Sequence, residues 1–577
     1  MCSKSALKTS KILTVPVPCR EVMDANEKLG VLRMYKNKIT KALLLGAGLA
    51  VAASSTTTAF AADVPAGIKL AEKQEIVRGN GTEVATIDPH KSSGVPESHV
   101  IRDLLEGLVN QDGDGNTIPG VAESWETTDN QTFTFHLRKD AKWSNGDPVT
   151  AQDFVYSWQR FVDPATASPY AWYMEFTKMV NAKEIIEGKK EKSTLGVKAV
   201  DAHTLVVELE TAVPYFVMMV GHTSMKPVHK ATIEKYGDQW TKPGHFVGNG
   251  AYELDKWVVN ERMVLKRNVQ YWDNDKSVID KVTFLPIENQ NAEMNRFLSG
   301  EIDFTDDLPI EHFKRMQKEH PEDLSVVGSL CSYYYIFNTK KKPFNDSRVR
   351  KAISYAIDRD IVANAIMGQG QKPAYFLTPE ITAGFDPELP AYGRMTQKER
   401  NAEASRLLAE AGYGKDNPLE FTFLYNTDEN HKKLAVALGS MWKKTLGLKV
   451  TLENQEWKTY LSSTKTGDFE VARAGWCGDY NEASTFLTLM TSDNTSAGQH
   501  WGNNDYDILI DNAFHSTSEE ERTKFYLDAE KLMAKEMPIA PIYQYVKTRL
   551  LNPHVGGFPS NNAQEMIYTK DLYIKAD

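Results

Sequence analysis

The chain has 577 residues, of which 25% are charged, and 77 acidic residues outnumber 67 basic ones to give a formal net charge of −10. Because domains typically hold roughly 100–200 residues, this length predicts two or three domains. An acidic chain without a basic stretch argues against a nucleic-acid-binding protein.

The N-terminal region has the pattern of a secretory leader. Three lysines precede an apolar run at 42–53, and the small-residue site Ala59-Phe-Ala61 follows it. A run of 12 apolar residues is too short for a membrane anchor. We therefore expect a signal peptide over 34–61, cleaved after Ala61, and interpret 1–33 as a misassigned upstream extension. Since no cysteine follows this site to carry a lipid, the expected product is a free protein of a bacterial periplasm.

The cysteines fit this compartment. Cys2 and Cys19 belong to the leader region, so only Cys331 and Cys477 remain in the expected product. In an oxidising compartment a disulfide between them is the default expectation. A metal site would need further ligands, and none cluster near either cysteine in the sequence.

Apolar strands alternate with amphipathic helices along most of the chain, which indicates an α/β protein. Apolar and polar residues alternate over 132–138, as expected of a half-buried strand. Over 151–161 the apolar residues recur on one helical face: Phe154, Val155, Trp158 and Phe161.

The clearest βαβ pattern follows in the C-terminal half. Strands are predicted over 419–425 and 448–453. The amphipathic helix between them is expected to begin at a Thr427 cap and to end at Gly447. This unit predicts a parallel sheet in this part of the chain.

A short helix over 457–461 leads to a further strand over 469–476, which carries Arg473. In open α/β sheets ligands bind beyond the carboxyl ends of strands, so Asp479 is a candidate contact for a cationic ligand group. His431, near the end of the preceding strand, is expected to face the same cleft. Alternatively, Asp479 and Arg473 pair only with each other as a structural bridge, and His431 is a surface residue.

Signatures of catalysis are absent from the sequence. It contains no G-x-S-x-G elbow, no H-E-x-x-H, no Walker loop and no G-x-G-x-x-G that opens a helix. The glycines of Met367-Gly-Gln-Gly-Gln371 follow a helix and are interpreted as its C-terminal stop. Asp306, Asp307 and Glu311 have the pattern of a solvated face. No catalytic residue is predicted.

Longer motifs are spread over 62–577, and they include Gly120-Val-Ala-Glu-Ser-Trp125, Phe133-Thr-Phe-His-Leu-Arg138, Asp153-Phe-Val-Tyr-Ser-Trp158, Phe344-Asn-Asp-Ser-Arg-Val-Arg350 and Leu407-Leu-Ala-Glu-Ala-Gly412. These motifs resemble the family 5 extracellular solute-binding proteins. Within that family, the segments 454–458 and 473–482 are similar to those of the oligopeptide-binding members.

The resemblance implies the fold of a two-lobed periplasmic binding protein of type II, cluster C, with an extra domain and a hinged ligand cleft. Lobe I is expected to comprise 62–105, 230–330 and 547–577. The additional domain II is expected over 106–229 and lobe III over 331–546. Both remaining cysteines then fall in lobe III, which their disulfide would stiffen.

The resemblance also implies a binding site for peptides. Asp479 would pair with the α-ammonium group, and Gly475 and Cys477 would offer backbone groups. Arg473 and His431 match positions that meet the carboxyl end of short ligands. Further positions would line the cleft: Val95, Tyr170, Trp457 and Tyr545. Alternatively, Tyr170 and Trp457 are ordinary core aromatics.

Six residues depart from the family pattern in this expected cleft. Met367 stands where the oligopeptide binders have a lysine, and Ser93 and Ile336 stand where they have glutamates. Asp306 replaces a cleft tyrosine, and Thr464 and Lys465 replace an Arg-His pair. These changes of charge are expected to alter the preferred length and side-chain charge of the ligand.

Together these features predict the peptide-binding component of an ABC importer, which delivers short oligopeptides to permease subunits in the inner membrane. The expected protein is a monomer without cofactor or metal. One alternative is a murein-tripeptide binder of the same family. An alternative of another class is a periplasmic hydrolase that uses Asp479 and Glu482 as acid and base.

Overall fold

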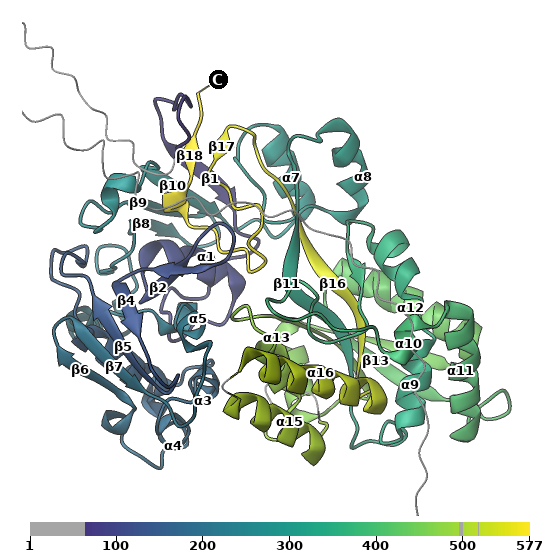
Figure 1. Cartoon of the computed structure of the whole chain (residues 1–577). Helices are drawn as coiled ribbons and strands as arrows, with labels where there is room; N and C mark the ends of the chain where they lie inside the picture. The colour runs from purple at the N-terminus through teal and green to yellow at the C-terminus, as the bar shows by residue number, and fades with distance from the viewer. Residues whose placement is uncertain (1–63, 495–499, 517, 577) are drawn as a thin grey trace, which may run out of the picture. The chain divides into compact units, whose positions relative to one another are not determined.

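The computed structural model describes residues 64–494, 500–516 and 518–576 (Figure 1). The expected leader over 34–61, its cleavage site and the extension over 1–33 lie outside these ranges. Within them, no helix combines the length and the apolarity that a membrane span requires.

Three larger sheets organise the fold. The first has the strand order β1 (Glu75–Gly79), β10 (Lys281–Leu285), β9 (Arg262–Arg267) and β8 (Tyr252–Val258). The second has the order β4 (Ala122–Glu126), β5 (Thr132–Leu137), β7 (Thr204–Glu208) and β6 (Val197–Asp201). The third has the order β12 (Lys372–Pro373), β16 (Ile539–Leu550), β11 (Leu324–Phe337), β15 (Val471–Cys477), β13 (Glu420–Asn426) and β14 (Lys449–Gln455). Two small ribbons complete the strands: β2 (Val109–Gln111) with β3 (Thr117–Pro119), and β17 (Val555–Gly556) with β18 (Tyr573–Ile574).

Helices connect these strands. The α-helices are α1 (Val95–Leu104), α2 (Ala151–Val162), α3 (Trp172–Phe176), α4 (Ala182–Ile186), α5 (Phe216–Met219), α6 (Lys230–Tyr236), α7 (Gln290–Leu298), α8 (Ile310–Glu319), α9 (Ser347–Tyr355), α10 (Ala391–Arg394), α11 (Gln397–Glu410), α12 (Glu429–Leu446), α13 (Trp457–Thr466), α14 (Ser484–Leu487), α15 (Asn504–His515) and α16 (Glu519–Glu536). A π-helical segment, η6 (Ile361–Met367), precedes β12.

The six-stranded sheet is mixed. Strand β13 runs parallel to both β14 and β15, as the βαβ pattern predicts. Strand β11 is antiparallel to both β15 and β16, which the sequence pattern did not show. The long strands β11 and β16 lie side by side in Figure 1 and pair from Leu324↔Leu550 to Ile336↔Ile539. The carboxyl ends of β13 and β15 therefore lie at one edge of the sheet.

The interior of this sheet explains why α12 packs where it does. The indole of Trp442 is fully buried and contacts the rings of Phe421 and Phe423 of β13. Its Nε1 donates a hydrogen bond of 2.9 Å to the carbonyl oxygen of Ile353, so its polar group is also satisfied. The predicted apolar stripe of this helix is thus part of the core.

The predictions for strand β5, helix α2 and the glycine helix stops hold. Strand β5 and helix α2 occupy the predicted ranges, and Phe154, Trp158 and Phe161 of α2 are fully buried. The predicted stops are confirmed, because Gly447 and Gly368 end their helices in the left-handed conformation with φ of 69° and 68°.

The prediction that Thr427 caps α12 is wrong. Asp428 is the N-cap, and its carboxylate accepts a hydrogen bond of 2.9 Å from the backbone N–H of His431. The Thr427 hydroxyl instead contacts Asn454 and Gln455 at the end of β14. The hydroxyl of Thr427 is therefore bound to strand β14, and the Asp428 carboxylate caps the helix instead.

Each of the three sheets lies largely within one of the expected lobes, but the lobe boundaries themselves remain a prediction. The four-stranded sheet with β5 lies within 106–229, and most of the six-stranded sheet lies within 331–546. Strands β11 and β16 run through the predicted boundaries at 330 and 546 without a break. If the boundaries are correct, these paired strands connect lobe I with lobe III.

Candidate functional site

A cavity of about 530 Å³ lies where several chain segments meet. Its wall includes the start of α1, the segment 222–224, the start of α12, the end of β15 with the loop after it, part of β16, and the segment 563–566. Nine predicted site residues line it: Ser93, Val95, Tyr170, Met367, His431, Gly475, Cys477, Asp479 and Tyr545. The structure thus brings together most of the residues that the sequence singled out.

Asp479 lies in this wall among neutral partners. Its side chain is 11% exposed, and Oδ1 accepts a hydrogen bond of 2.8 Å from the hydroxyl of Tyr170. The Nε2 atom of His222 lies 3.6 Å from the same oxygen. Burial raises the pKa of Asp479 to about 7, while the hydrogen bond from Tyr170 acts in the opposite direction.

His222 does not act as a counter-charge for Asp479. Its Nδ1 accepts a hydrogen bond of 3.3 Å from the backbone N–H of Ser224, so in the neutral ring the proton sits on Nε2, which faces Asp479. Burial, and then the cations Arg102 and Lys226, lower the pKa of His222 to about 3. At neutral pH the ring is therefore uncharged, and among the described residues no cation forms an ion pair with Asp479.

Arg473 and Asp479 do not form the structural bridge considered as an alternative. The guanidinium of Arg473 donates a hydrogen bond of 2.8 Å to the hydroxyl of Tyr545 and one of 3.4 Å to Oδ1 of Asn426. It also lies 4.9 Å from the ring centre of Tyr333. Arg473 is not among the residues that line the cavity, whereas Tyr545 is. The cavity therefore meets a tyrosine hydroxyl that Arg473 holds in place, and the expected direct contact of Arg473 with a ligand is not seen in the wall.

His431 is partly buried in the cavity wall, contrary to the surface alternative. Its side chain is 14% exposed, and its Nδ1 lies 3.5 Å from the hydroxyl of Tyr333 and from Oδ1 of Asp428. Burial, and then Arg473, lower the pKa of His431 to about 2, so the ring is neutral. It can bind a ligand by hydrogen bonds but supplies no charge at neutral pH.

The remaining predicted residues have varied positions. Val95 opens α1 and is 59% exposed, whereas Met367 ends η6 and is buried. Ile336 is buried in the core, so its difference from the relatives does not change the cavity wall. The side chain of Trp457 lies outside the part of the chain that the structure describes.

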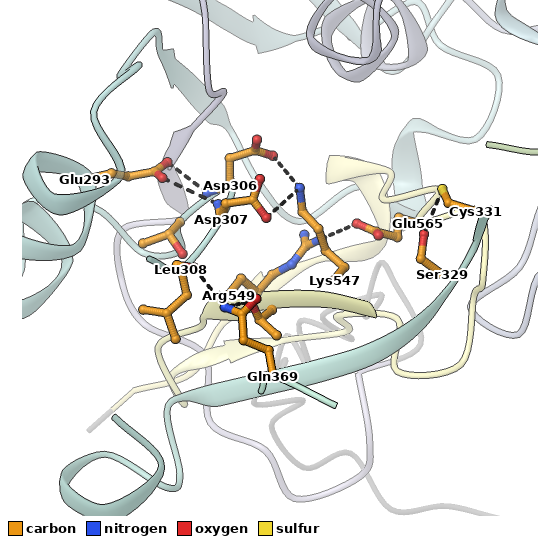
Figure 2. A network of polar contacts seen from close by, with 12 residues as sticks. Glu293, Asp306, Asp307, Leu308, Ser329, Cys331, Gln369, Lys547, Arg549 and Glu565 are labelled. Carbon is orange, nitrogen blue, oxygen red and sulfur yellow. Dashed lines mark hydrogen bonds and ion pairs between the residues drawn. The ribbon is translucent and has the colours of Figure 1, made fainter. Parts of the chain in front are cut away.

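A charge network at another part of the wall was not expected from the sequence (Figure 2). The ammonium group of Lys547 lies 3.5 Å from Oδ1 of Asp306 and 3.2 Å from Oδ1 of Asp307. The carboxyl group of Glu293 accepts hydrogen bonds from the backbone N–H groups of both aspartates, at 2.8 and 3.4 Å. Although burial favours the neutral amine, Asp306 and then Asp307 raise the pKa of Lys547 above its usual value.

The prediction of a solvated face is therefore wrong for Asp306 and Asp307 and right for Glu311, which is exposed. The chain before the two aspartates forms a bridge from Phe304 to Leu551, just after β16, and this directs both carboxylates toward Lys547. Local spacing cannot reveal a partner so distant in sequence. The only signal was the pair Lys547 and Arg549 inside a strand whose other residues are uncharged.

The predicted disulfide is confirmed. Cys331 of β11 and Cys477 of β15 are directly paired in register, with their Cα atoms 4.0 Å apart, and they form a disulfide bond. The hydroxyl of Ser329 donates to Sγ of Cys331 at 3.0 Å (Figure 2). Because Cys477 is two residues before Asp479, the bond ties the loop that carries the carboxylate to the neighbouring strand.

Comparisons with known proteins agree with this arrangement. The family model for bacterial extracellular solute-binding proteins, family 5 Middle, matches residues 116–498. The periplasmic oligopeptide-binding protein OppA of Salmonella typhimurium is 51% identical over 539 residues, which cover 93% of this chain and 99% of the relative.

Solved structures give the same result. The murein tripeptide-binding protein MppA of Escherichia coli is similar with a TM-score of 0.83 and 49% identity, over 88% of this chain and 100% of that one. OppA of Haemophilus influenzae in complex with the peptide RPPGFSPFR is similar with a TM-score of 0.81 and 46% identity, over 88% and 100% of the two chains. The fold is thus that of the two-lobed periplasmic binding proteins.

Proposed function

We propose that this chain, which belongs to the family 5 bacterial extracellular solute-binding proteins, is the periplasmic component of an ABC importer that binds short oligopeptides. The observation that carries the proposal is the carboxylate of Asp479, which is only 11% exposed and lines the cavity with only neutral partners beside it. A buried carboxylate is costly unless a cation accompanies it. The α-ammonium group of a peptide supplies that cation.

The edge of β15 gives the peptide backbone a place to bind. On one side β15 pairs with β11 over its whole length, from Val471 to Cys477. On the other side β13 pairs with it only at Val471 and Ala472. Within the described sheet, residues 473–477 therefore keep one edge without a strand partner, and 475–477 line the cavity. An extended peptide can add to such an edge through main-chain hydrogen bonds, which do not depend on sequence.

The other residues of the wall receive roles from this placement. Tyr170 orients the Asp479 carboxylate through its hydrogen bond. Tyr545 and His431 offer a hydroxyl and a neutral imidazole to the far part of the ligand. Val95, Ser93 and Met367 bound the space for its side chains. Because none of these brings a second charge, they suit ligands of varied sequence.

We infer the physiological role from membership of the family. The signal peptide over 34–61 exports the chain, cleavage after Ala61 releases it into the periplasm, and the monomer carries peptides to permease subunits of the inner membrane. Closure of the lobes around the peptide is the expected motion. The proposed boundaries place the hinge at the paired strands β11 and β16.

Binding is proposed in preference to hydrolysis because the suggested acid–base pair is not assembled. Glu482 lies 3.3 Å from the guanidinium of Arg522 and accepts hydrogen bonds from Ser484. It is not among the residues found in the wall of the cavity around Asp479. The two carboxylates therefore cannot act together on one bond held in this cavity.

Mass spectrometry of ligands released from protein purified without refolding tests the proposal. A mixture of short peptides is the expected result. A single peptide that contains diaminopimelate would instead assign the chain to murein peptides, which the similarity to MppA favours as the second candidate. If no peptide is released and the ligand-free protein does not bind trialanine in calorimetry, the proposal is wrong.

A further inference from the structure

One charged group in the cavity wall, the guanidinium of Arg102, has no role in the function proposed so far. Arg102, in the last turn of α1, is only 7% exposed and lines the cavity. Its Nη1 contacts the thioether sulfur of Met566 at 2.6 Å, and its guanidinium lies 5.9 Å from the ring centre of Tyr568. Its Nε has no hydrogen-bond partner in the described structure. A buried guanidinium with a thioether as its polar contact is poorly satisfied.

The carboxylates nearest to Arg102 are committed to other groups. Asp103 accepts hydrogen bonds from the backbone N–H and the hydroxyl of Thr569. Glu565 forms an ion pair with Arg549. Arg102 itself forms no ion pair with any carboxylate in the part of the chain that the structure describes.

Lys547 is a cation of the same wall that has carboxylate partners. Two aspartates lie within 3.5 Å of its ammonium group, so its charge is neutralised by the protein itself. The charge of Arg102 is not neutralised in this way, although both residues line the same cavity. Lys547 therefore needs no anion from a ligand, whereas Arg102 still has room for one.

Arg102 is linked to the loop of Asp479 through the segment 564–566 of the cavity wall. It contacts Met566, and two residues earlier the side chain of Gln564 donates a hydrogen bond of 3.2 Å to the carbonyl oxygen of Gly478, which precedes Asp479. After burial, Arg102 is also the largest influence that lowers the pKa of His222, the ring beside Asp479. Arg102 and His222 thus belong to the same part of the wall, and the amine anchor proposed at Asp479 directs the first residues of a ligand toward this part.

We propose that Arg102 binds a carboxylate in the first two residues of the ligand, so that the protein prefers peptides with an acidic side chain next to their amino terminus. This inference rests on the proposed function, since it needs the amine at Asp479. The planar guanidinium can donate two parallel hydrogen bonds to a carboxylate, whereas an amide of the same size offers only one acceptor atom. Such a pair would replace the thioether as the polar partner of Arg102.

Calorimetry on ligand-free protein tests the preference with five peptides: trialanine, Glu-Ala-Ala, Gln-Ala-Ala, Ala-Glu-Ala and Ala-Gln-Ala. At one or both positions glutamate should bind at least about tenfold more tightly than glutamine, because a hydrogen bond to a charged group is involved. In Arg102→Gln this ratio should fall to about one. Arg102→Lys keeps the charge but loses the planar pair of N–H donors, so it should retain part of the preference for glutamate.

The controls separate the possible failures. Arg348→Gln removes an exposed cation that does not line the cavity and should leave the ratio unchanged. If the wild-type protein binds glutamate and glutamine peptides alike at both positions, or if the ratio persists in Arg102→Gln, the inference is wrong while peptide binding stands. If none of the five peptides binds, the proposed function itself fails. The wild-type comparison needs no variant, so it decides the question even where Arg102→Gln does not fold.

Discussion

Two charged residues of the cavity wall, Asp479 and Lys547, are buried to a similar degree but have opposite surroundings. The Asp479 side chain is 11% exposed and that of Lys547 is 18% exposed. Asp479 has a hydroxyl and a neutral imidazole as partners, whereas Lys547 has two carboxylates. Burial alone therefore does not mark a ligand contact. The useful signal is a buried charge that the protein leaves without a counter-charge, because there the ligand has to supply it.

The strongest test of this contrast removes the charge at Asp479. Asp479→Asn keeps the shape of the side chain and should cost about 3–5 kcal/mol in affinity for trialanine, since it leaves the peptide ammonium buried without a partner. N-acetylated trialanine, which has no ammonium group, should bind the wild-type protein weakly and should gain nothing from Asp479. Calorimetry with both peptides on both proteins measures this coupling directly.

Asp307→Asn is the matched control, because it also removes a carboxylate from the cavity wall, but one that Lys547 already neutralises. It should leave the preference for a free amine in place. Equal binding of free and acetylated peptides by the wild-type protein would refute the amine anchor.

At the other position the charge should matter for stability. Lys547→Met leaves Asp306 and Asp307 without their cation, which costs roughly 3–5 kcal/mol for a fully buried pair. Because the Asp307 side chain is 40% exposed, we expect less here, about 2–3 kcal/mol in the free energy of unfolding by urea. The triple variant with Asp306→Asn and Asp307→Asn should recover most of this loss. A Lys547→Met protein of normal stability that no longer binds trialanine would show instead that Lys547 serves the ligand.

This second position also shows where prediction from sequence stops. The βαβ unit of β13, α12 and β14 was predictable because its signals are local: alternating residues in the strands, an apolar stripe in the helix and Gly447 at its end. The disulfide was predictable because only two cysteines remain in an oxidising compartment. Asp306 and Asp307 were misinterpreted because their partner lies on β16, far along the chain.

The candidate site shows the same division. Asp479 was found from its place just beyond a strand end, and the residue matches to the family supplied most of the other lining residues. Neither source showed that Arg473 meets Tyr545 or that His222 faces Asp479. Both contacts join segments that no periodic pattern relates. Arg102 was missed for a similar reason, because a basic residue in the last turn of a helix is what helix electrostatics alone would favour.

The pH dependence of binding gives a smaller effect with a defined sign. The pKa of Asp479 is about 7 in the ligand-free protein, and the ammonium group binds the ionised form. Affinity for trialanine should therefore be greatest near pH 7–8 and should be roughly 50-fold lower at pH 5. Above about pH 8 it should fall again, because the peptide amine loses its proton. Calorimetry at constant ionic strength over this range checks the profile.

The folding stability of the ligand-free protein should fall over the pH range in which the affinity for trialanine rises. Since folding raises the pKa of Asp479, its contribution to stability is fully present below about pH 4, the unfolded value, and is lost as the pH rises through about 7. Relative to Asp479→Asn, the ligand-free wild-type protein should lose stability over that interval, and saturating trialanine should restore it. An affinity that does not change between pH 5 and pH 7 would contradict the assignment.

The smallest expected effect concerns the hydroxyl of Tyr170, which donates a hydrogen bond to the Asp479 carboxylate. The Tyr170 hydroxyl donates to Asp479 at 2.8 Å and lowers the pKa of this carboxyl group, so Tyr170→Phe should raise that pKa further. At pH 7 the affinity for trialanine should fall about tenfold, as expected for the loss of a hydrogen bond to a charged group. At pH 8 the loss should be smaller, because more of the carboxylate is ionised again. Tyr545→Phe, which removes a cavity hydroxyl bonded to Arg473, should not move the midpoint of the pH profile. If Tyr170→Phe weakens binding equally at every pH, Tyr170 only shapes the wall, and the neutral environment of Asp479 does not depend on it.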